Sequence, residues 1–447
     1  MSDSMPLAPQ AKSTRGSSAI PLAPPPPTSG RTVRNITIVC FLAWVVSVYD
    51  FTLFGTLLPV IAEDFGWTLA ESTAIVTWVT LGTLIVAFAV GPLLDRFGRK
   101  PALIICVMGA ALCSGATALV VGPLSLIIVR AFSGLGYSEE VVNSVYLNEM
   151  YGKSKRRGFL YGLVQSGWPV GAMLGAGLTA LLLPIVGWRW SFVIAIIPSI
   201  AVAIAATRMP ESPVFLALKR VRHLRSEGNT EEADALETAY ELPTGSHKPH
   251  IRELFVPGLR RHTICMLLIW LFFWMPVQVF AVLGTTVLTA AKDIPFDNAL
   301  LILVMANAAG FAGYIFHGWL GDHFNRRRTV MLGWSLATIL TVILLLGPSN
   351  PGFVIPMYAL VLFFLTGAVS ALMFYMGEAT PAHVRGMSVN LAHLMGPIGA
   401  LLGSALLTLV LSMGYSMTTA ALFAGSLFLG LSVLLLFGTN RVEQHHH

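Results

Sequence analysis

Long apolar runs alternate with short polar connectors along most of this chain of 447 residues. A helix that crosses a bilayer core of ~30 Å needs about 20 apolar residues. The runs that meet this requirement are 35–61, 74–94, 102–120, 124–150, 159–184, 191–208, 264–288, 300–320, 330–347, 353–379, 388–413 and 417–438. The pattern predicts an all-α integral membrane protein of twelve transmembrane helices in two six-helix bundles.

The polar segments set the expected domain boundaries. Residues 1–34 are rich in Pro, Ser and Ala, which predicts a disordered tail, and they lack the apolar core of a secretory signal. Residues 209–263 form one long charged connector between a bundle at 35–208 and a bundle at 264–438. Residues 439–447 form a short tail, and its last three histidines are typical of a purification tag.

Composition and charge support a membrane location. The chain is 55% hydrophobic and 11% charged, whereas a soluble domain is about 25% charged. Of the 28 Lys and Arg residues, all but Arg130, Arg189 and Lys292 lie in the two tails or the even-numbered connectors, which leaves 28 − 3 = 25 there. Such residues favour the cytoplasmic side. We therefore expect an inner-membrane protein with both termini cytoplasmic, and we attribute the net charge of +6 to topology rather than to nucleic-acid binding.

The sequence contains no pattern typical of an enzyme. The four cysteines lie inside apolar runs and none has the spacing of metal ligands. A nucleotide-binding loop, a nucleophile triad and a metal cluster are all missing from the sequence pattern. We expect no enzymatic activity, no metal and no cofactor.

The two halves repeat each other at a nearly constant offset. The loop 91–100 matches 318–327 at an offset of 227, and the glycine-rich segment 169–175 matches 397–403 at an offset of 228. Glu149 and Arg157 correspond to Glu378 and Arg385. Halves of six helices insert the same way round, are related by an axis along the membrane normal, and enclose a site near the bilayer midplane. The repeat therefore predicts a site between the bundles.

The first of these loops carries a recognisable motif. Gly91-Pro-Leu-Leu-Asp95-Arg-Phe-Gly-Arg99-Lys100 resembles the G-x-L-x-D-x-x-G-R-[KR] signature of the major facilitator superfamily, and the second loop departs from it only in having Asn325 for the usual Gly. The resemblance covers residues 35–440. It implies the major facilitator fold and secondary transport by alternating access, in which the bundles rock about a central site.

The charged residues of these loops are candidates for a cytoplasmic gate. Carboxylates and cations in one layer can pair with each other and with helix termini, and such a latch would hold the bundles closed until they rock. The alternative interpretation is that the charges only fix topology in tight turns. The gate residues implied by the motif and its repeat are Asp95, Arg99, Lys100, Glu149, Arg157, Asp322, Arg326, Glu378 and Arg385.

Ionisable residues inside apolar runs are expensive and are therefore candidates for function. Asp50 lies in the first run, and Arg130, Glu139 and Glu140 lie in the fourth. At ~1.5 Å of rise per residue, Asp50 and Arg130 reach comparable depths, so we expect them to pair. The pair is either a static staple between two helices or a proton-coupling site, in which withdrawal of the arginine lets the aspartate take a proton.

The two adjacent glutamates point about 100° apart on a helix, and Glu140 lies about 80° from Arg130 whereas Glu139 lies about 180° away. We therefore expect Glu140 to be the cavity acid and a second protonation or substrate-sensing site. Glu139, also a proton-coupling candidate, either pairs elsewhere or is protonated at a helix interface. The pattern Arg130…Gly134…Glu140 resembles the fourth span of the metabolite or organic acid–proton symporter and sugar-porter branches. Asp50 and the segment 210–213, Pro-Glu-Ser-Pro, also resemble those branches.

Other polar residues in the spans are weaker candidates. The residues that could contact a substrate are Arg130, Tyr49, Gln165, Gln278, Asn307 and Asn390. Hydrogen bonding between helices explains any one of the amides equally well. His393 is either structural or part of a proton relay, and a lone histidine on a helix is more often structural. Most of the aromatic residues Trp78, Trp168, Trp270, Phe273 and Trp274 are expected to face lipid or the interface.

The leading hypothesis is a monomeric proton-coupled symporter that takes up a small organic anion, such as a monocarboxylate, a sugar acid or an aromatic acid. One alternative is a drug–proton antiporter, although the segment 162–171 departs from the pattern of those relatives and places Trp168 within it. The other is a nutrient sensor that does not transport, with a partner-binding helix at 231–240 in the connector.

Overall fold

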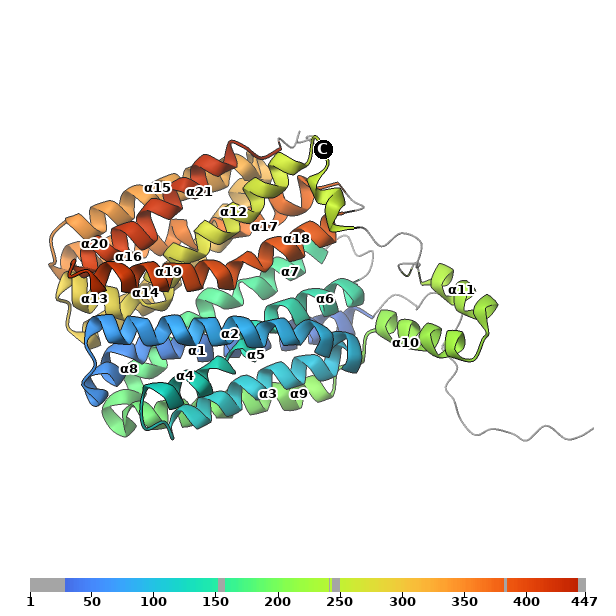
Figure 1. Ribbon diagram of the computed structural model, residues 1–447, viewed down its shortest axis with the longest axis horizontal. Helices are drawn as coiled ribbons and strands as arrows, with labels where there is room; N and C mark the ends of the chain where they lie inside the picture. Colours follow the sequence, from blue (N-terminus) through green and yellow to red (C-terminus); the bar gives the residue numbers. More distant parts are fainter. Residues whose placement is uncertain (1–28, 152–156, 241, 243–249, 382–383, 441–447) are drawn as a thin grey trace, which may run out of the picture. The chain divides into compact units, whose positions relative to one another are not determined.

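The computed structural model describes residues 29–440 except 152–156, 241, 243–249 and 382–383 (Figure 1). The chain divides into two compact units. The larger unit, residues 28–212 and 248–447, contains the apolar helices. The smaller unit includes the connector segment 213–247 and is described separately.

The N-terminal bundle is built from the helices of the first half. Its elements are α1 (Gly30–Phe65), α2 (Leu69–Phe97), α3 (Arg99–Thr117), α4 (Pro123–Ala131), α5 (Gly134–Tyr137), α6 (Glu139–Tyr151), α7 (Arg157–Gln165), α8 (Gly167–Ile194) and α9 (Ile196–Thr207). The elements α4 to α6 together form one interrupted crossing, and α7 continues into α8 after a break of one residue.

The C-terminal bundle repeats this arrangement. Its elements are α12 (Arg260–Pro276), the π-helix η2 (Val277–Val282), α13 (Gly284–Lys292), α14 (Phe296–His323), α15 (Arg326–Leu346), α16 (Pro351–Leu365), α17 (Val369–Glu378), α18 (Arg385–His393), α19 (Met395–Ser412), α20 (Met417–Ala421), the π-helix η3 (Leu422–Ser426) and α21 (Leu427–Leu436). A short 3-10 helix, η1 (Ile251–Phe255), precedes it. Figure 1 shows the helices of both bundles side by side with roughly parallel axes.

The described residues account for twelve crossings. Ten helical segments are long and apolar enough to span a membrane. One of them, Leu160–Thr207, contains two crossings, because Gly187 has a φ of 76° and breaks the helix there. The interrupted crossing α4–α6 adds the twelfth. The predicted count of helices and the two-bundle fold are confirmed.

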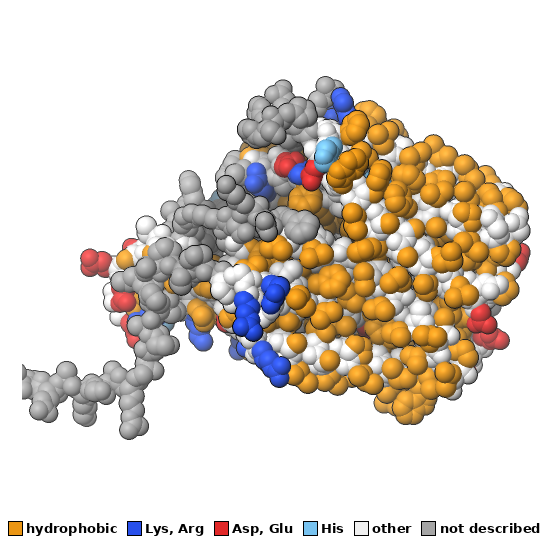
Figure 2. Space-filling view, turned by 180° about the vertical axis from the view of Figure 1, so that it is seen from behind, with side chains coloured by type: hydrophobic (Ala, Val, Ile, Leu, Met, Phe, Trp, Pro, Cys, Tyr) orange, Lys and Arg blue, Asp and Glu red, His pale blue; other side chains and the backbone are white. Residues whose placement is uncertain are grey.

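Hydrophobic side chains cover the flank of the larger unit (Figure 2). Large apolar residues such as Ile85, Leu119, Ile185, Ile315 and Leu434 are exposed on its surface. A soluble protein rarely exposes contiguous apolar area of this extent, whereas the hydrocarbon of a bilayer covers it without penalty. This surface agrees with a multi-pass membrane protein.

Two of the three cations that lie outside the tails and the even-numbered connectors, Arg189 and Lys292, have structural roles at helix ends. Arg189 donates hydrogen bonds to the carbonyl oxygens of Ala118 and Val120 at 3.0 and 2.8 Å, just after α3. Lys292 donates to the carbonyl oxygens of Leu345 and Gly347 at 3.0 and 2.7 Å, at the end of α15. Burial lowers the pKa of the Lys292 ammonium. Both cations therefore satisfy carbonyl groups that a helix C-terminus leaves unpaired.

The connector contains a helical hairpin rather than an extended loop. Its helices α10 (Pro213–Ser226) and α11 (Thr230–Ala239) pack through a small core of Ala217, Val221, Leu224, Ala233 and Leu236. Asn229 caps α11 by accepting a hydrogen bond from the backbone N–H of Glu232 at 3.3 Å. The structure thus contains the helix expected at 231–240.

Several observed helix boundaries lie beyond the expected ones, and two of them mark the start of a bundle. The first helix begins at Gly30 rather than residue 35, because Ser29 provides an N-cap, its Oγ accepting a hydrogen bond from the N–H of Thr32 at 3.2 Å. The second bundle begins at Arg260 rather than residue 264. In both places the helix extends beyond the apolar run into charged residues. Hydrophobicity alone does not predict this extension.

Candidate functional site

The two bundles are packed tightly against each other at one end, called here the closed end. Thr285 of α13 donates its hydroxyl to the carbonyl oxygens of Gly55 and Thr56 of α1 at 3.2 and 2.9 Å. The hydroxyls of Thr77 of α2 and Thr408 of α19 are 3.3 Å apart. These hydrogen bonds join α1 to α13 and α2 to α19, so both contacts cross between the halves.

The closed end depends on a glycine. A Cβ atom at Gly55 would lie 2.3 Å from the carbonyl oxygen of Val282 in the other bundle. No side chain can occupy that space, so only glycine lets the two backbones approach this closely.

Two cavities lie between the bundles away from the closed end. The first has a volume of about 210 Å³ and the second about 230 Å³. Both are lined by Glu140, Ser144, Tyr161 and His393. The first extends along α1, α7, α8, α12, α14 and α17, and the second between α2 and α18–α19. Because ligand sites for drug-sized molecules are commonly about 300–1,000 Å³, each cavity suits a smaller solute.

Aromatic side chains form the wall of the first cavity, where the sequence-based expectation was wrong. Trp168, Trp270, Phe273 and Trp274 line this cavity and are buried, instead of facing lipid. Of the predicted aromatic set, Trp78 is exposed, as expected of a lipid-facing residue. These rings face the other bundle, and the sequence of one helix does not reveal which face that is.

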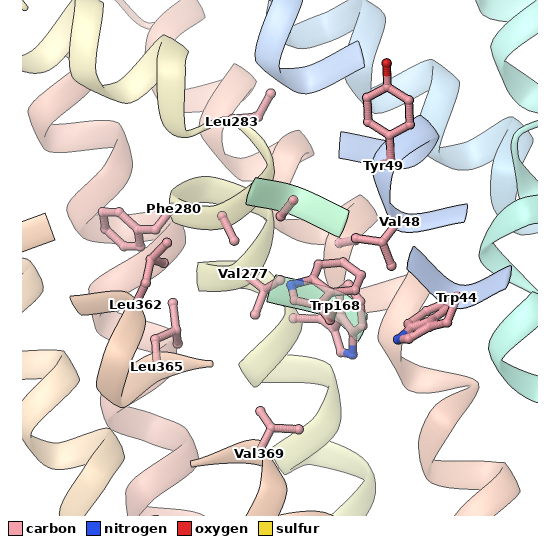
Figure 3. Packing of buried hydrophobic residues seen from close by; sticks show 14 of the residues in the cluster. Trp44, Val48, Tyr49, Trp168, Val277, Phe280, Leu283, Leu362, Leu365 and Val369 are labelled. Atoms are coloured by element: carbon pink, nitrogen blue, oxygen red, sulfur yellow. The ribbon is translucent and has the colours of Figure 1, made fainter. Parts of the chain in front are cut away.

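The rings contact one another across the bundle interface. Trp168 of α8 and Trp274 of α12 have ring centroids 5.5 Å apart and planes at 90°, and Trp44 of α1 lies 6.0 Å from Trp168. Figure 3 shows Trp168 between Trp44 and Val277. Such edge-to-face packing is a favourable arrangement of aromatic rings, and it leaves apolar faces for a flat solute.

Glu140 stands at the junction of the two cavities. Gln165 of α7 donates a hydrogen bond from Nε2 to Glu140 Oε1 at 2.7 Å and approaches the Tyr161 hydroxyl at 2.8 Å. His393 of α18, in the other bundle, has its Nε2 atom 3.7 Å from Glu140 Oε1. The glutamate therefore has one partner in each half.

Glu139 points the other way, into the N-terminal bundle. It is fully buried, and neither carboxyl oxygen has a hydrogen-bond partner among the described residues. It does not contribute to the described lining of either cavity. The helical-wheel expectation that the two glutamates face different surroundings agrees with these positions.

Asp50 and Arg130 are in contact, deep inside the N-terminal bundle. Arg130 donates from Nη1 to Asp50 Oδ1 at 3.2 Å and from Nη2 to the Asp50 backbone oxygen at 3.1 Å. Arg130 is 1% exposed and Asp50 is 3% exposed. The guanidinium also lies 5.4 Å from the Phe54 ring and 5.7 Å from the Phe192 ring. The pair is buried and lines neither of the two cavities between the bundles.

The other predicted substrate contacts divide between the cavities and the helix interior. Gln165 lines the first cavity and Asn390 the second. Arg130 and Gln278 line a separate small space of about 20 Å³ near Gly55. Tyr49 is buried, and Figure 3 shows its ring directed away from Trp168.

Asn307 is also away from the cavities. It is buried and donates a hydrogen bond to the carbonyl oxygen of Leu303 on its own helix at 2.9 Å. This bond within one helix satisfies its donor locally, so in this conformation Asn307 has a structural contact rather than a cavity position.

The gate candidates of the first half form one cluster at the end of the larger unit opposite the closed end, called here the gate end. Arg99 pairs with Glu149 at 2.7 Å, and Glu149 also accepts a hydrogen bond from the Ser212 hydroxyl. Glu211 accepts from the backbone N–H groups of Arg99 and Lys100 at 3.1 and 3.2 Å. The Pro-Glu-Ser-Pro segment therefore caps the N-terminus of α3.

The gate candidates of the second half form a matching cluster. Arg326 pairs with Asp322 at 2.6 Å and with Glu378. Arg385 is exposed. The side chains of Asp95 and Arg157 lie outside the described residues. The described ion pairs at the gate end thus each join residues of the same half.

Two packed bundles, a central cavity and duplicated charge clusters at one end define a class of membrane transporter in which two domains move about a site between them. The sequence matches the profile of the Major Facilitator Superfamily over residues 40–315 and that of the sugar (and other) transporters over residues 279–439. The chain belongs to the Major Facilitator Superfamily.

Several characterised proteins are similar to this chain over most of its length. It is 27% identical to a gallate transporter of Pseudomonas putida, over 85% of this chain and 86% of that one. It is 24% identical to a 4-hydroxybenzoate transporter of Pseudomonas aeruginosa (86% and 87%) and 25% identical to a niacin transporter of Acinetobacter baylyi (80% and 83%).

Among solved structures, the fold is similar to the inward open conformation of the xylose transporter of E. coli. The TM-score is 0.71 at 16% identity, covering 92% of this chain and 97% of that one. At this level of identity the likeness concerns the fold.

Proposed function

We propose that this protein is a proton-coupled symporter that takes up a small aromatic carboxylate. The observation that carries the proposal is the first cavity, which places a tryptophan wall and one carboxylate, Glu140, between two bundles. An aromatic ring packs against Trp168 and Trp274 by stacking and edge-to-face contact. The names of the relatives, which transport gallate, 4-hydroxybenzoate and niacin, support the same chemical class.

The side that the cavity faces is compatible with uptake into the cytoplasm. Its lining includes Asn148, Phe374 and Val389, which lie next to the gate clusters in the chain, whereas the opposite end is sealed by the Gly55 and Thr285 contacts. With the gate end on the cytoplasmic side, as the distribution of Lys and Arg favours, this conformation exposes the cavity to the cytoplasm, as the release step of uptake requires.

Proton coupling rests on two acids in different surroundings. Glu140 is on the cavity and can exchange protons with solvent there, whereas Asp50 is held by Arg130 behind the closed end. When the bundles rock and the closed end opens, Asp50 becomes the acid that faces outside. Each acid is then accessible from one side of the membrane at a time.

The test is uptake into proteoliposomes. Purified protein should accumulate labelled 4-hydroxybenzoate when the outside is made acidic, and a protonophore should abolish the accumulation. Accumulation that persists with the protonophore contradicts proton coupling. Export under the same gradient would favour an antiporter.

A further inference from the structure

His393 meets Glu140 at the one place where both cavities and both bundles come together. The two side chains lie on α18 and α6, and their Nε2 and Oε1 atoms are 3.7 Å apart, too long for a hydrogen bond. The Nε2 atom is buried and has no hydrogen-bond partner among the described residues. A polar atom in this position is available to a ligand.

The other ring nitrogen fixes the tautomer of His393. Nδ1 lies 2.9 Å from the carbonyl oxygen of Val389. Because a carbonyl oxygen can only accept, Nδ1 carries a hydrogen, and in the neutral ring Nε2 is a bare acceptor. A bare Nε2 atom and an ionised carboxylate repel each other. A proton on either His393 Nε2 or the Glu140 carboxylate would replace this repulsion by attraction.

The internal repeat shows that His393 and Gln165 occupy equivalent positions. Their offset is 393 − 165 = 228, the same as between Pro169 and Pro397. Each is the last residue before a break, between α7 and α8 or between α18 and α19. Both approach Glu140, at 2.7 Å for Gln165 and 3.7 Å for His393. One copy of the position holds a neutral amide, and the other holds a group that can become a cation.

A carboxylate in the cavity needs a cation, and the described lining offers one candidate. Apart from His393, the titratable side chains that line either cavity are Glu140 of α6, Tyr137 of α5, Tyr161 of α7 and Tyr314 of α14. The described lining from α1, α2, α8, α12, α17 and α19 carries no charge. Among these residues only His393 can become positive near neutral pH.

We propose that protonated His393 binds the carboxylate of the transported acid, and that Glu140 competes with this carboxylate for the imidazolium. The inference rests on the proposed function. In the empty cavity one proton is held by the pair, with Gln165 donating to the carboxylate of Glu140. A second proton from solvent binds to Glu140, neutralises it and frees the imidazolium. Each monocarboxylate then enters with one proton taken up.

The experiment compares an acid with its uncharged isostere. Binding of 4-hydroxybenzoate and 4-hydroxybenzamide to the purified full-length protein is measured by calorimetry in two buffers of different ionisation enthalpy, which gives both affinity and proton uptake. Replacing His393 by Gln should weaken binding of the acid by about tenfold or more, since a hydrogen bond to a charged group is lost. Binding of the amide should change less than about twofold, and it also reports that the variant is folded.

Two further variants separate the roles of the pair. His393→Arg keeps a permanent cation and should keep the preference for the acid. In the double variant His393→Arg, Glu140→Gln, acid binding should become independent of pH between about pH 6 and about pH 8, with no proton uptake. His323→Gln is the matched control, because His323 has the same Nδ1 contact to a backbone carbonyl, 2.9 Å from Trp319 O, but is exposed.

The possible results are distinct. If His393→Gln still prefers the acid over the amide, His393 is not the carboxylate site, although the aromatic cavity and the proposed function stand. If His393→Gln does not fold, loss of the acid preference in His393→Arg overturns the inference in the same way. If the wild-type protein binds neither compound, the proposed substrate class is wrong and the inference falls with it.

Discussion

Two pairs of ionisable side chains beside the cavities and the closed end differ in where their members come from. Asp50 and Arg130 both belong to the N-terminal bundle, are 3.2 Å apart and lie away from the large cavities. Glu140 and His393 belong to different bundles, are 3.7 Å apart and line both cavities. A pair within one bundle can stay intact while the bundles rock, whereas a pair between bundles must change its distance. In this conformation the first pair stabilises the N-terminal bundle, whereas the distance within the second pair depends on how the two bundles are placed.

The largest effect among the variants that test this difference is expected from replacing Arg130. Arg130→Gln should leave the Asp50 charge buried without its partner and lower stability by about 3–5 kcal/mol. The double variant with Asp50→Asn should recover part of that loss, because no uncompensated charge remains. Thermal unfolding of the purified protein measures both.

Arg96→Gln serves as the control for this prediction. Arg96 is exposed beside the Phe97 ring, so its replacement should change stability by no more than about 0.5 kcal/mol. If Arg130→Gln were equally mild, the pair would not be a stabilising contact. An Asp50→Asn variant whose uptake kept the wild-type pH dependence would contradict the coupling role of Asp50.

The next largest effect should come from the glycine at the closed end. Gly55→Val places atoms where Val282 O lies and should destabilise the closed arrangement by about 1–3 kcal/mol. The protein should then favour the state in which the closed end is open and Arg130 is reachable from that side. The readout is alkylation of a cysteine at Thr285, faster in Gly55→Val than in the parent. Equal rates would indicate that this contact does not control closure.

A change in the aromatic wall tests the cavity beside the second pair. Trp168→Ala removes the ring that contacts both Trp44 and Trp274. Loss of one aromatic contact worth about 1 kcal/mol should weaken binding of 4-hydroxybenzoate about fivefold, while the pH dependence of binding is kept. Trp78→Ala, on the exposed surface, should have no effect on affinity.

The smallest effect is expected at the gate end. Glu378→Gln breaks the contact with Arg326, whose partner Asp322 remains at 2.6 Å. Because the Glu378 side chain is 42% exposed, stability should fall by no more than about 1 kcal/mol. A much larger loss of stability on denaturation would show that the Arg326–Glu378 pair stabilises the protein as strongly as the buried Asp50–Arg130 pair does.

The sequence predicted the first pair better than the second. The depth of Asp50 and Arg130 follows from counting residues along two helices, and the structure brings them together. The orientation of Glu140 followed from its angle to Arg130. A lone histidine on a helix, such as His393, is more often structural than a proton relay. Its proximity to Glu140 is not predictable from residues 385–412, because no pattern there indicates a contact with α6.

The interior of the cavity was hard to predict for the same reason. Trp270 and Trp274 look lipid-facing in an apolar run, and only the packing of α12 against the other bundle makes them a cavity wall. The sequence predicts Tyr49 and Asn307 as substrate contacts, yet each is buried against its own bundle. Local periodicity gives the direction of a side chain on its helix, whereas the identity of the neighbouring helix depends on the assembled fold.

Together with the proposed proton coupling, the repeat also leads to an expectation about the net charge that crosses the membrane in each transport cycle. Counted at the offset of Glu149 and Glu378, 378 − 149 = 229, the counterpart of Glu140 is Val369, an apolar residue on the first cavity. The duplicated halves thus present a single carboxylate to the solute among the described lining residues. With one proton carried for each singly charged anion, no net charge would cross the bilayer. The accumulation of solute would then depend on the pH difference across the membrane and would not depend on the membrane potential.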